Sequence, residues 1–235
     1  MIEIKDLTFW YSKQNRIFEG LNLNLDSGHI YGLLGKNGAG KTTLLKLICG
    51  LSFPKTGSVS VNGYIPSKRQ PRFLSDIFFL PEEISLPSFT PLKFADVYQD
   101  FYPAFNYDQY RVCLGNFEVA ANQGMNKLSH GQQKKAMLAF ALATNTSCLF
   151  LDEPTNGLDI PSKAAFRRML AVSFSEGKTI ILSTHMVRDL QSMIDSVLIL
   201  ENHMISYTPT VDQNLEDFFI ASVSNQEIVS TSFEN

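Results

Sequence analysis

The segment Gly35–Thr42, with the sequence GKNGAGKT, constrains the fold of this chain more than any other feature. It follows an apolar run, Ile30–Leu34, that has the character of a buried strand, and it precedes a helical pattern at Lys41–Gly50. Gly38 and Gly40 allow the backbone to turn its N–H groups inward, and the N-terminus of the helix adds partial positive charge. A strand, a glycine-rich turn and a helix in this order predict a loop that binds a polyphosphate.

Two side chains at the end of this phosphate loop, defined as Gly35–Thr42, fit the same chemistry. Lys41 is long enough to reach the β- and γ-phosphates of a nucleotide, and the Thr42 hydroxyl suits Mg²⁺. A chance match in a glycine-rich turn is the alternative, but both flanking segments have the pattern that the motif requires. The loop therefore predicts nucleotide binding.

A second polar feature follows another apolar run. Asp152 and Glu153 come directly after Cys148–Leu151, at the carboxyl end of an expected strand. Ligands of open α/β sheets bind at that edge, where Asp152 could hold Mg²⁺ through its water shell and Glu153 could polarise an attacking water. Two acids after an apolar run are, taken alone, common where a strand meets solvent. Together with the phosphate loop, they predict the second half of a nucleotide site.

The remaining pattern predicts a layered α/β core. Alternating apolar and polar residues in the first quarter, with an Asn62-Gly63 hairpin signal, indicate an antiparallel patch near the N-terminus. Compact apolar runs typical of a buried parallel sheet then alternate with helical segments. The expected strands are Ile30–Leu34, Ser147–Leu151, Thr179–Ser183 and Val197–Leu200, and the expected helices are Lys41–Gly50, Pro161–Glu176 and Met186–Ile194.

Prolines and clustered aromatic residues set the stretch 84–143 apart, and we interpret it as a helical subdomain inserted in the core. The aromatic side chains could fill a small helical core, or they could form an exposed surface on which a partner docks. We expect a single domain whose nucleotide-binding core comprises 1–83 and 144–206, with a C-terminal tail at 207–235. That tail contains a short amphipathic segment around Leu215–Phe219.

Composition excludes several classes of protein. The 235 residues carry a net charge of −3 without a cluster of basic residues, which argues against nucleic acid as a partner. The longest stretch without Asp, Glu, Lys or Arg, Ala136–Leu151, is shorter than the ~20 residues of a membrane span, and no secretory signal opens the chain. The 3 cysteines lack CxxC spacing, so we expect buried thiols in a reducing cytoplasm rather than disulfides or a zinc site.

Three further motifs narrow the class of nucleotide-binding protein. Leu128–Gln132, LSHGQ, opens a helical pattern in which Ser129 and Gln132 have the spacing of a capping box. Gly157–Asp159 follows the paired acids, and Ser183–His185 ends the next apolar run with a histidine. Each has an ordinary structural interpretation in isolation, as the LSHGQ segment could be no more than a helix cap.

Taken in order, GKNGAGKT, LSHGQ, CLFLDEP, GLD and STH make the chain resemble the nucleotide-binding subunits of ATP-binding-cassette (ABC) transporters over nearly its whole length. The family signature L-S-G-G-Q corresponds to LSHGQ here. The resemblance implies a P-loop NTPase core with a mostly parallel sheet, an antiparallel N-terminal β subdomain and an inserted helical subdomain. It also implies ATP hydrolysis with ATP and Mg²⁺. A GTPase is disfavoured, because Asn126–Ser129 lacks the aspartate of a guanine-reading motif.

The resemblance also implies roles for individual residues. Glu153, His185 and Lys41 would be catalytic, while Thr42, Asp152 and Glu82 would lie on the metal side. Tyr11 would stack on adenine, although its register against Trp10 stays open. The residues implied to bind ATP are Tyr11, Gly35, Asn37, Gly38, Ala39, Gly40, Lys41, Thr42 and Thr43.

A head-to-tail dimer that sandwiches two ATP molecules is implied as well. Ser129, Gly131 and Gln132 would face the γ-phosphate of the ATP held by the other protomer, and Asp159 would line the dimer seam.

Two positions depart from the family pattern. His130 replaces the first glycine of the signature pair, which adds bulk beside an anion site. Glu82 stands where the family has a glutamine that contacts Mg²⁺, with Glu83 as the alternative register, and it adds negative charge near phosphate.

We expect the partners to be a second ATPase subunit and a separately encoded integral membrane permease, with the chain bound to the cytoplasmic face of the membrane. The Phe101–Pro103 segment and the compact length resemble bacterial drug- and antibiotic-export ATPases. An importer, a soluble assembly or clamp ATPase, and a nucleotide sensor without hydrolysis are the alternatives.

Overall fold

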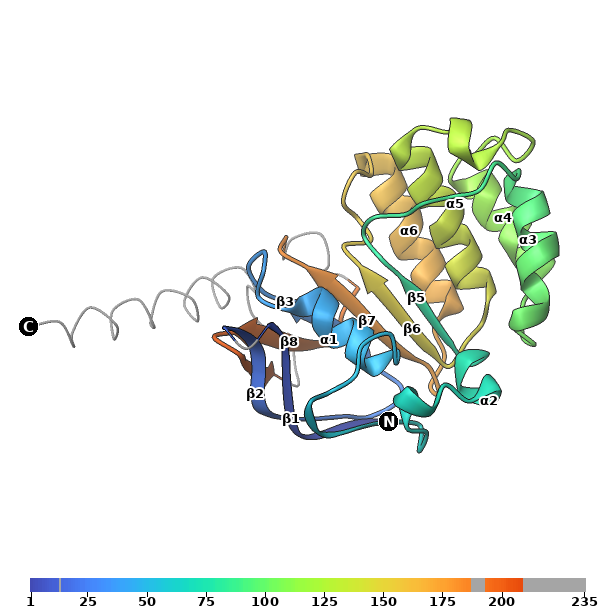
Figure 1. Cartoon of the computed structure of the whole chain (residues 1–235). Coiled ribbons are helices and arrows are strands. Elements are labelled where there is room, and N and C mark those ends of the chain that lie inside the picture. Colours follow the sequence, from blue (N-terminus) through green and yellow to red (C-terminus); the bar gives the residue numbers. More distant parts are fainter. Residues whose placement is uncertain (13, 187–192, 209–235) are drawn as a thin grey trace, which may run out of the picture.

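The computed structural model describes residues 1–12, 14–186 and 193–208, which form two β-sheets and two groups of helices (Figure 1). The predicted segment around Leu215–Phe219 and most of the helix predicted at Met186–Ile194 lie outside the described residues.

The larger sheet has six strands in the order β5-β6-β7-β3-β8-β9, all parallel except for the antiparallel edge strand β9. This confirms the prediction of a mostly parallel sheet, and all four predicted runs are strands in it. Two strands were not predicted, β5 and β9, and β9 runs into the range expected to be a tail. The bounds are β3 Ile30–Leu34, β5 Ile77–Leu80, β6 Cys148–Asp152, β7 Thr179–Thr184, β8 Ser196–Glu201 and β9 Met204–Thr208.

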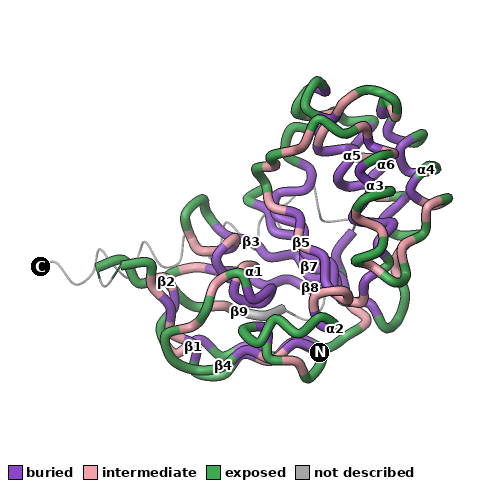
Figure 2. Tube along the Cα trace, turned by 45° about the vertical axis from the view of Figure 1, so that its right-hand side comes forward, coloured by how far each residue is buried: buried purple, intermediate pink, exposed green. Residues whose placement is uncertain are grey.

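The strands of this sheet are apolar throughout because both faces are buried. In β6, Leu149 and Leu151 pack into one core, and Cys148 and Phe150 pack into the other. A strand buried on both faces lacks polar alternation, which is why these runs were recognisable in the sequence. Figure 2 shows the buried strands running between the two layers that cover them.

The smaller sheet is antiparallel, in the order β2-β1-β4, and comprises β1 Ile2–Ser12, β2 Asn15–Leu25 and β4 Thr56–Val61. The predicted turn at Asn62-Gly63 is present, with φ values of 49° and 79°. It is closed by a single bridge between Val61 and Tyr64, and β4 pairs with β1 instead. The hairpin interpretation was therefore wrong, because the chain after the turn enters a short helical turn rather than a second strand.

Helices cover both faces of the large sheet. On one face, α1 and Phe73 of α2 pack with the antiparallel sheet, and α3 to α6 gather over the other face (Figure 1). None of the helices in the described ranges has the length and apolar character needed to cross a membrane. The helices are α1 Lys41–Ile48, α2 Pro71–Leu74, α3 Pro91–Tyr98, α4 Tyr107–Asn116, α5 His130–Ala143 and α6 Ile160–Ser173, with 3₁₀ turns η1 Pro66–Lys68, η2 Gln99–Phe101 and η3 Met125–Lys127.

The clustered aromatic residues of the 84–143 segment mostly pack inward around Phe140 of α5. Ring centroids of Phe94 and Phe105 lie 5.0 and 5.1 Å from that of Phe140, and Tyr110 lies at 5.9 Å. Phe140 is buried, whereas Phe101 is 63% exposed. Filling a helical core therefore accounts for most of the aromatic cluster, and a docking surface remains open only for the residues around Phe101.

We predict that Phe140→Ala lowers the free energy of unfolding by about 3–5 kcal/mol, because it removes the ring around which the helical layer is packed. Urea denaturation followed by circular dichroism measures this change. Val172→Ala, at a side chain that is 87% exposed, is the control and should shift stability by no more than ~0.5 kcal/mol. Equal losses in the two variants would contradict the packing described for Phe140.

Candidate functional site

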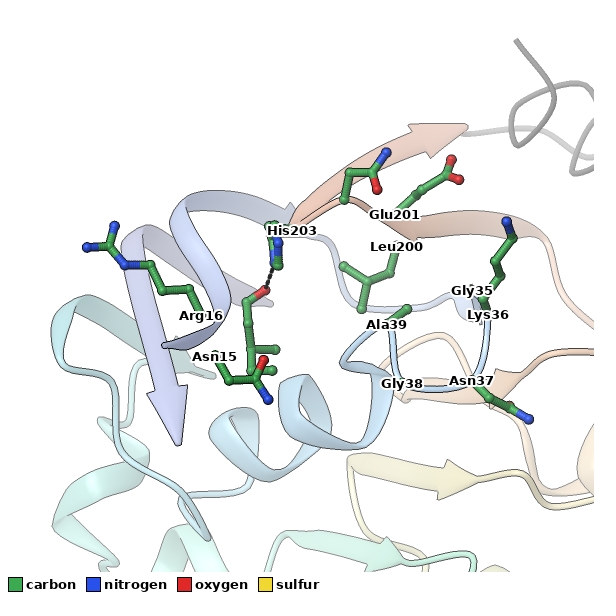
Figure 3. A pocket seen from close by; sticks show the side chains of 12 residues that line it. Asn15, Arg16, Gly35, Lys36, Asn37, Gly38, Ala39, Leu200, Glu201 and His203 are labelled. Atoms are coloured by element: carbon green, nitrogen blue, oxygen red, sulfur yellow. Dashed lines mark hydrogen bonds between the residues drawn. The ribbon is translucent and has the colours of Figure 1, made fainter. Parts of the chain in front are cut away.

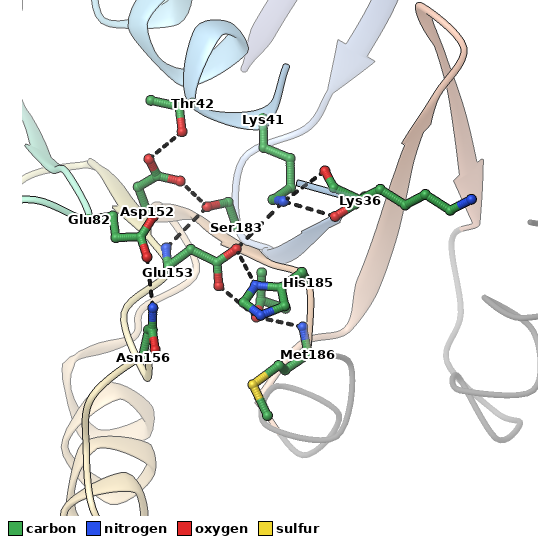
Figure 4. A network of polar contacts seen from close by, with 12 residues as sticks. Lys36, Lys41, Thr42, Glu82, Asp152, Glu153, Asn156, Ser183, His185 and Met186 are labelled. Carbon is green, nitrogen blue, oxygen red and sulfur yellow. Dashed lines mark hydrogen bonds and ion pairs between the residues drawn. The ribbon is translucent and has the colours of Figure 1, made fainter. Parts of the chain in front are cut away.

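The polar ends of three parallel strands meet at one edge of the large sheet. Leu34 of β3 pairs with Thr184 of β7, and Asp152 of β6 pairs with Ser183 of β7. The phosphate loop after β3, the acids that end β6, and the Ser183–His185 segment that ends β7 therefore lie side by side (Figure 4). The parallel register alone brings these three sequence motifs together.

The phosphate loop adopts a backbone that its glycines allow. Gly38 and Gly40 have φ values of 82° and 109°, and a Cβ on Gly40 would lie 2.7 Å from the Ile17 side chain. The Lys41 ammonium folds back over the loop and donates to the carbonyl oxygens of Gly35 at 2.8 Å and Lys36 at 3.3 Å. A glycine-bounded turn that ends at the N-terminus of α1 directs N–H groups and a lysine toward one place.

Asp152 receives hydrogen bonds from two hydroxyls. Thr42 Oγ1 donates to Asp152 Oδ2 at 2.6 Å, and Ser183 Oγ donates to Asp152 Oδ1. Asp152 is only 2% exposed, so these bonds keep a buried carboxylate satisfied. The Thr42 bond joins the phosphate loop directly to the end of β6.

Glu153 lies between a lysine and a histidine. Its Oε1 is 3.5 Å from Lys41 Nζ and 2.9 Å from His185 Nδ1, and Thr184 Oγ1 donates to Oε2 at 3.1 Å. The Glu153 backbone has a φ of 46°, and its N–H donates to both the carbonyl and the hydroxyl of Ser183. A non-glycine residue in the left-handed region is uncommon, and the surrounding bonds hold this buried carboxylate in a fixed orientation.

Tyr11 lies beside the start of α1. Its hydroxyl is 3.3 Å from Thr43 Oγ1, and 60% of the residue is exposed, so its ring is open to a ligand. The Trp10 ring lies beneath Lys55 instead, with Nζ 5.9 Å from the ring centroid. This placement favours Tyr11 over Trp10 as the aromatic residue next to the phosphate loop.

A cavity of about 270 Å³ lies against the loop (Figure 3). It is lined by Gly35–Ala39, by Asn15–Ile17 at the start of β2, and by Leu200–His203 at the turn between β8 and β9. His203 Nδ1 donates to the Ile17 carbonyl at 2.9 Å and so ties that turn to β2. These last two segments were not predicted from the sequence, because neither has a motif and β9 was not expected.

Glu82 lies just beyond β5, at the same sheet edge. Asn156 Nδ2 donates to Glu82 Oε1 at 2.7 Å, and Lys134 Nζ donates to the Glu82 carbonyl at 3.3 Å. Glu82 and Glu83 both line the neighbouring cavity of about 520 Å³, together with His130 and Asn156. Of the two glutamates, only Glu82 is drawn in the network of Figure 4, which it joins through Asn156.

The LSHGQ segment forms the N-terminus of α5. Ser129 caps the helix by accepting a hydrogen bond from the Gln132 N–H at 3.3 Å, as its capping-box spacing indicates. Gly131 lies close to the chain after β6, since a Cβ there would be 3.2 Å from the Gly157 carbonyl. Among the described residues, Gln132 Oε1 is buried without a hydrogen-bond partner, and no hydrogen bond links this segment to the phosphate loop of the same chain.

Asp159 caps α6 in the same way. Its Oδ1 accepts from the Ser162 N–H at 2.8 Å, and Lys135 Nζ lies 3.6 Å from Oδ2. The hydrogen bonds from Ser162, with a smaller contribution from Lys135, lower the pKa of this exposed carboxyl. Asp159 therefore remains ionised and accessible at the surface.

Comparisons with known proteins agree with these features. The family model described as "ABC transporter" matches residues 18–156. The putative ABC transporter ATP-binding protein AlbC of Bacillus subtilis is 30% identical over 216 residues, which cover 87% of this chain and 90% of that protein. The chain belongs to the ABC transporter family.

Two further similarities help to place this ABC transporter protein. The Nod factor export ATP-binding protein I of Burkholderia lata is 30% identical over 191 residues, covering 79% of this chain and 63% of that protein. The solved dimer of the ATP-binding cassette MJ0796, in a post-hydrolysis state bound to ADP and Pi, matches with a TM-score of 0.78 at 22% identity, covering 91% of this chain and all 100% of that one. The family assignment confirms the predictions of an ATP-binding cassette fold and of an ATP-hydrolysing transporter subunit.

Ser183 is a residue of this site whose importance the sequence did not indicate. We predict that Ser183→Ala lowers the free energy of unfolding by about 1–3 kcal/mol, because it deprives the buried Asp152 carboxylate of a donor. Urea denaturation at neutral pH measures the change. Ser75→Ala is the control, since the Ser75 hydroxyl donates only to the Arg72 carbonyl near the surface. A loss no greater than that of the control would contradict the role given to Ser183.

Proposed function

We propose that this ABC transporter subunit hydrolyses ATP at the edge formed by β3, β6 and β7 and thereby powers a separate membrane permease, as part of an export system. The observation that carries the proposal is the continuous set of contacts from Lys41 through Glu153 to His185, beside the Thr42–Asp152 hydrogen bond. These contacts support the proposal, because they bring the Lys41 ammonium, the Glu153 carboxylate and the His185 imidazole around one point.

The phosphate loop binds the triphosphate. N–H groups from Asn37 to Thr43 and the Lys41 ammonium surround the β- and γ-phosphates, and Tyr11 stacks on the adenine. Lys41 Nζ lies 3.5 Å from Glu153 Oε1, which leaves no room for a phosphate between them, so the ammonium turns from the base to the γ-phosphate when the nucleotide binds.

The donor set fits Mg²⁺. Thr42 Oγ1 and Asp152 Oδ2 converge to 2.6 Å from two different elements, and hard oxygen ligands of this kind, completed by phosphate oxygens and water, are what Mg²⁺ prefers. Glu82 lies at the same edge as a further oxygen donor. When bound, Mg²⁺ neutralises charge on the phosphate oxygens.

Glu153 acts as the general base. Its carboxylate accepts the proton of the attacking water, while His185 and Thr184 hold its two oxygens in place. The left-handed backbone at Glu153, fixed by two hydrogen bonds to Ser183, directs the side chain away from Asp152. Two adjacent acids thereby serve different tasks, with Asp152 on the metal side and Glu153 on the water side.

A second copy or a related ATPase subunit completes the site. Ser129 and Gly131 lie at the N-terminus of the 14-residue helix α5, which offers N–H groups and a partial positive charge to an anion. Because these residues make no hydrogen bond to their own phosphate loop within the described residues, the γ-phosphate that they meet belongs to the other protomer, with Gln132 beside it and Asp159 at the seam. The similarity to a solved dimeric cassette supports this arrangement.

The permease docks in a groove of this subunit, at the cytoplasmic face of the membrane. A hollow of about 700 Å³ runs from the end of α1 past α2 and β5 to Phe101–Pro103. Its rim exposes apolar side chains, with Leu51 at 51% and Phe101 at 63%. Exposed apolar surface of this kind marks a site of protein–protein contact. The similarity to an export ATP-binding protein favours an exporter over an importer.

The catalytic assignment predicts that Glu153→Gln lowers kcat for ATP hydrolysis by about 10²- to 10⁴-fold, because the amide cannot accept the water proton. Nucleotide affinity, measured with a fluorescent ATP analogue, should be retained. In Lys41→Ala, by contrast, the affinity itself should fall, since a charged phosphate contact is lost. Hydrolysis by Glu153→Gln at the wild-type rate would exclude Glu153 as the base.

The docking assignment predicts that Phe101→Glu releases the chain from native membranes, because it places a charge on the apolar rim of the groove. Co-purification of an integral membrane protein with the tagged chain measures the association. Basal ATP hydrolysis by the isolated variant should match that of the wild type. Recovery of the wild-type chain without any membrane protein would instead favour a soluble assembly or clamp ATPase.

A further inference from the structure

Lys134 is a buried cation that the mechanism above does not use. It lies in α5, just after the LSHGQ segment, and is only 5% exposed. Lysine is rarely buried to this extent unless its ammonium has partners. Lys134 Nζ donates to two backbone carbonyls, that of Glu82 at 3.3 Å and that of Asp152 at 3.4 Å.

Those two carbonyls belong to the segments that carry the site carboxylates. Glu82 follows β5 and Asp152 ends β6, so a single ammonium attaches α5 to both chain segments at the sheet edge. The side chain of Glu82 is held at its other end by Asn156 Nδ2. Lys135, the neighbour of Lys134, pairs with Asp159 instead and takes no part in these contacts.

The charge of Lys134 matters as well as its hydrogen bonds. Burial lowers the pKa of its ammonium, and the carboxylates of Glu82, Asp152 and Glu153 oppose that shift. Three acids therefore lie where a negatively charged nucleotide must bind. The positive charge of Lys134 close to these acids reduces their repulsion of the nucleotide. Interactions between partly buried charges are several times stronger than in bulk water.

We propose that Lys134 is a positioning residue of the hydrolysis site, whose buried ammonium fixes the segments bearing Glu82 and Asp152 and offsets the negative charge of Glu82. The proposal rests on the function proposed above, because it takes those acids to be part of the ATP site. It also explains how a glutamate is tolerated at position 82, beside phosphate. α5 begins within the LSHGQ segment, which is proposed to meet the ATP of the other protomer. Lys134 therefore connects the helix that contacts that ATP to the acids of its own chain.

A double-mutant cycle tests this assignment. The variants are Glu82→Gln, Lys134→Met and the double variant, each assayed for kcat, for KM and for binding of a fluorescent ATP analogue. Lys134→Met should lower kcat about tenfold, and adding Glu82→Gln should recover about fivefold of that loss, since neighbouring charges in one network couple at this scale. Lys134→Arg, which keeps the charge, should retain more activity than Lys134→Met.

Salt dependence separates charge from a merely structural role. Glu82 is exposed, so its coupling to Lys134 should weaken markedly at ~1 M salt, where the screening length falls to ~3 Å. Lys178→Met is the matched control, because Lys178 is 4% exposed, donates to the Ser173 carbonyl at 3.2 Å and lies outside the site. That control should leave kcat unchanged even if its melting temperature falls as far as that of Lys134→Met.

Additive losses in the cycle, or a coupling that salt does not change, would overturn the assignment of Lys134. Should Lys134→Met fail to fold, Lys134→Gln takes its place, since it removes the charge and keeps a side-chain donor. A wild-type chain that does not hydrolyse ATP would overturn the proposed function and this assignment together. An active wild type with an additive cycle would overturn the assignment of Lys134 alone.

Discussion

Strands β3, β6 and β7 run parallel and in register, so the polar residues at their carboxyl ends lie close together at one edge of the sheet. The pairing of Leu34 with Thr184 and of Asp152 with Ser183 places the phosphate loop, the two acids and the histidine segment at one sheet edge. Burial of both sheet faces keeps this register, because a shift by one residue would exchange the apolar side chains of the two cores. The chemistry of this ABC transporter subunit therefore depends on how its core is packed.

Hydroxyl groups from different elements donate hydrogen bonds to the two adjacent carboxylates and hold them apart. Thr42 and Ser183 hold Asp152, whereas Thr184 and His185 hold Glu153, and the left-handed backbone at Glu153 separates the two side chains. Each hydroxyl comes from a rigid strand or helix end rather than from a long loop. These bonds hold both carboxylates in fixed orientations, whereas Lys41, which contacts Glu153 and two loop carbonyls, must change partners when a nucleotide binds.

Much of this site could be predicted from the sequence, because its strands are buried on both faces and its loop needs glycine. Four strands of the large sheet, the phosphate loop and the acids of β6 were all recognisable in that way. Strand β9 was missed because it has only five residues and runs into the range expected to be a tail, and Lys134 because a lysine in a helix is usually solvated. Ser183 was noted only as part of a strand end, since its value lies in contacts with residues far away in the sequence. At Asn62-Gly63 the sequence correctly predicted a turn but not the strand pairing, because β4 pairs with β1 and no strand follows the turn to form a hairpin.

A structure of the chain determined with a non-hydrolysable ATP analogue and Mg²⁺ would show directly whether the sheet edge binds the nucleotide. We expect the β- and γ-phosphates to lie within hydrogen-bonding distance of the N–H groups from Asn37 to Thr43 and of Lys41 Nζ. We also expect Ser129 of a second copy at the γ-phosphate. An analogue bound elsewhere, or with its phosphates directed away from Glu153, would exclude this site.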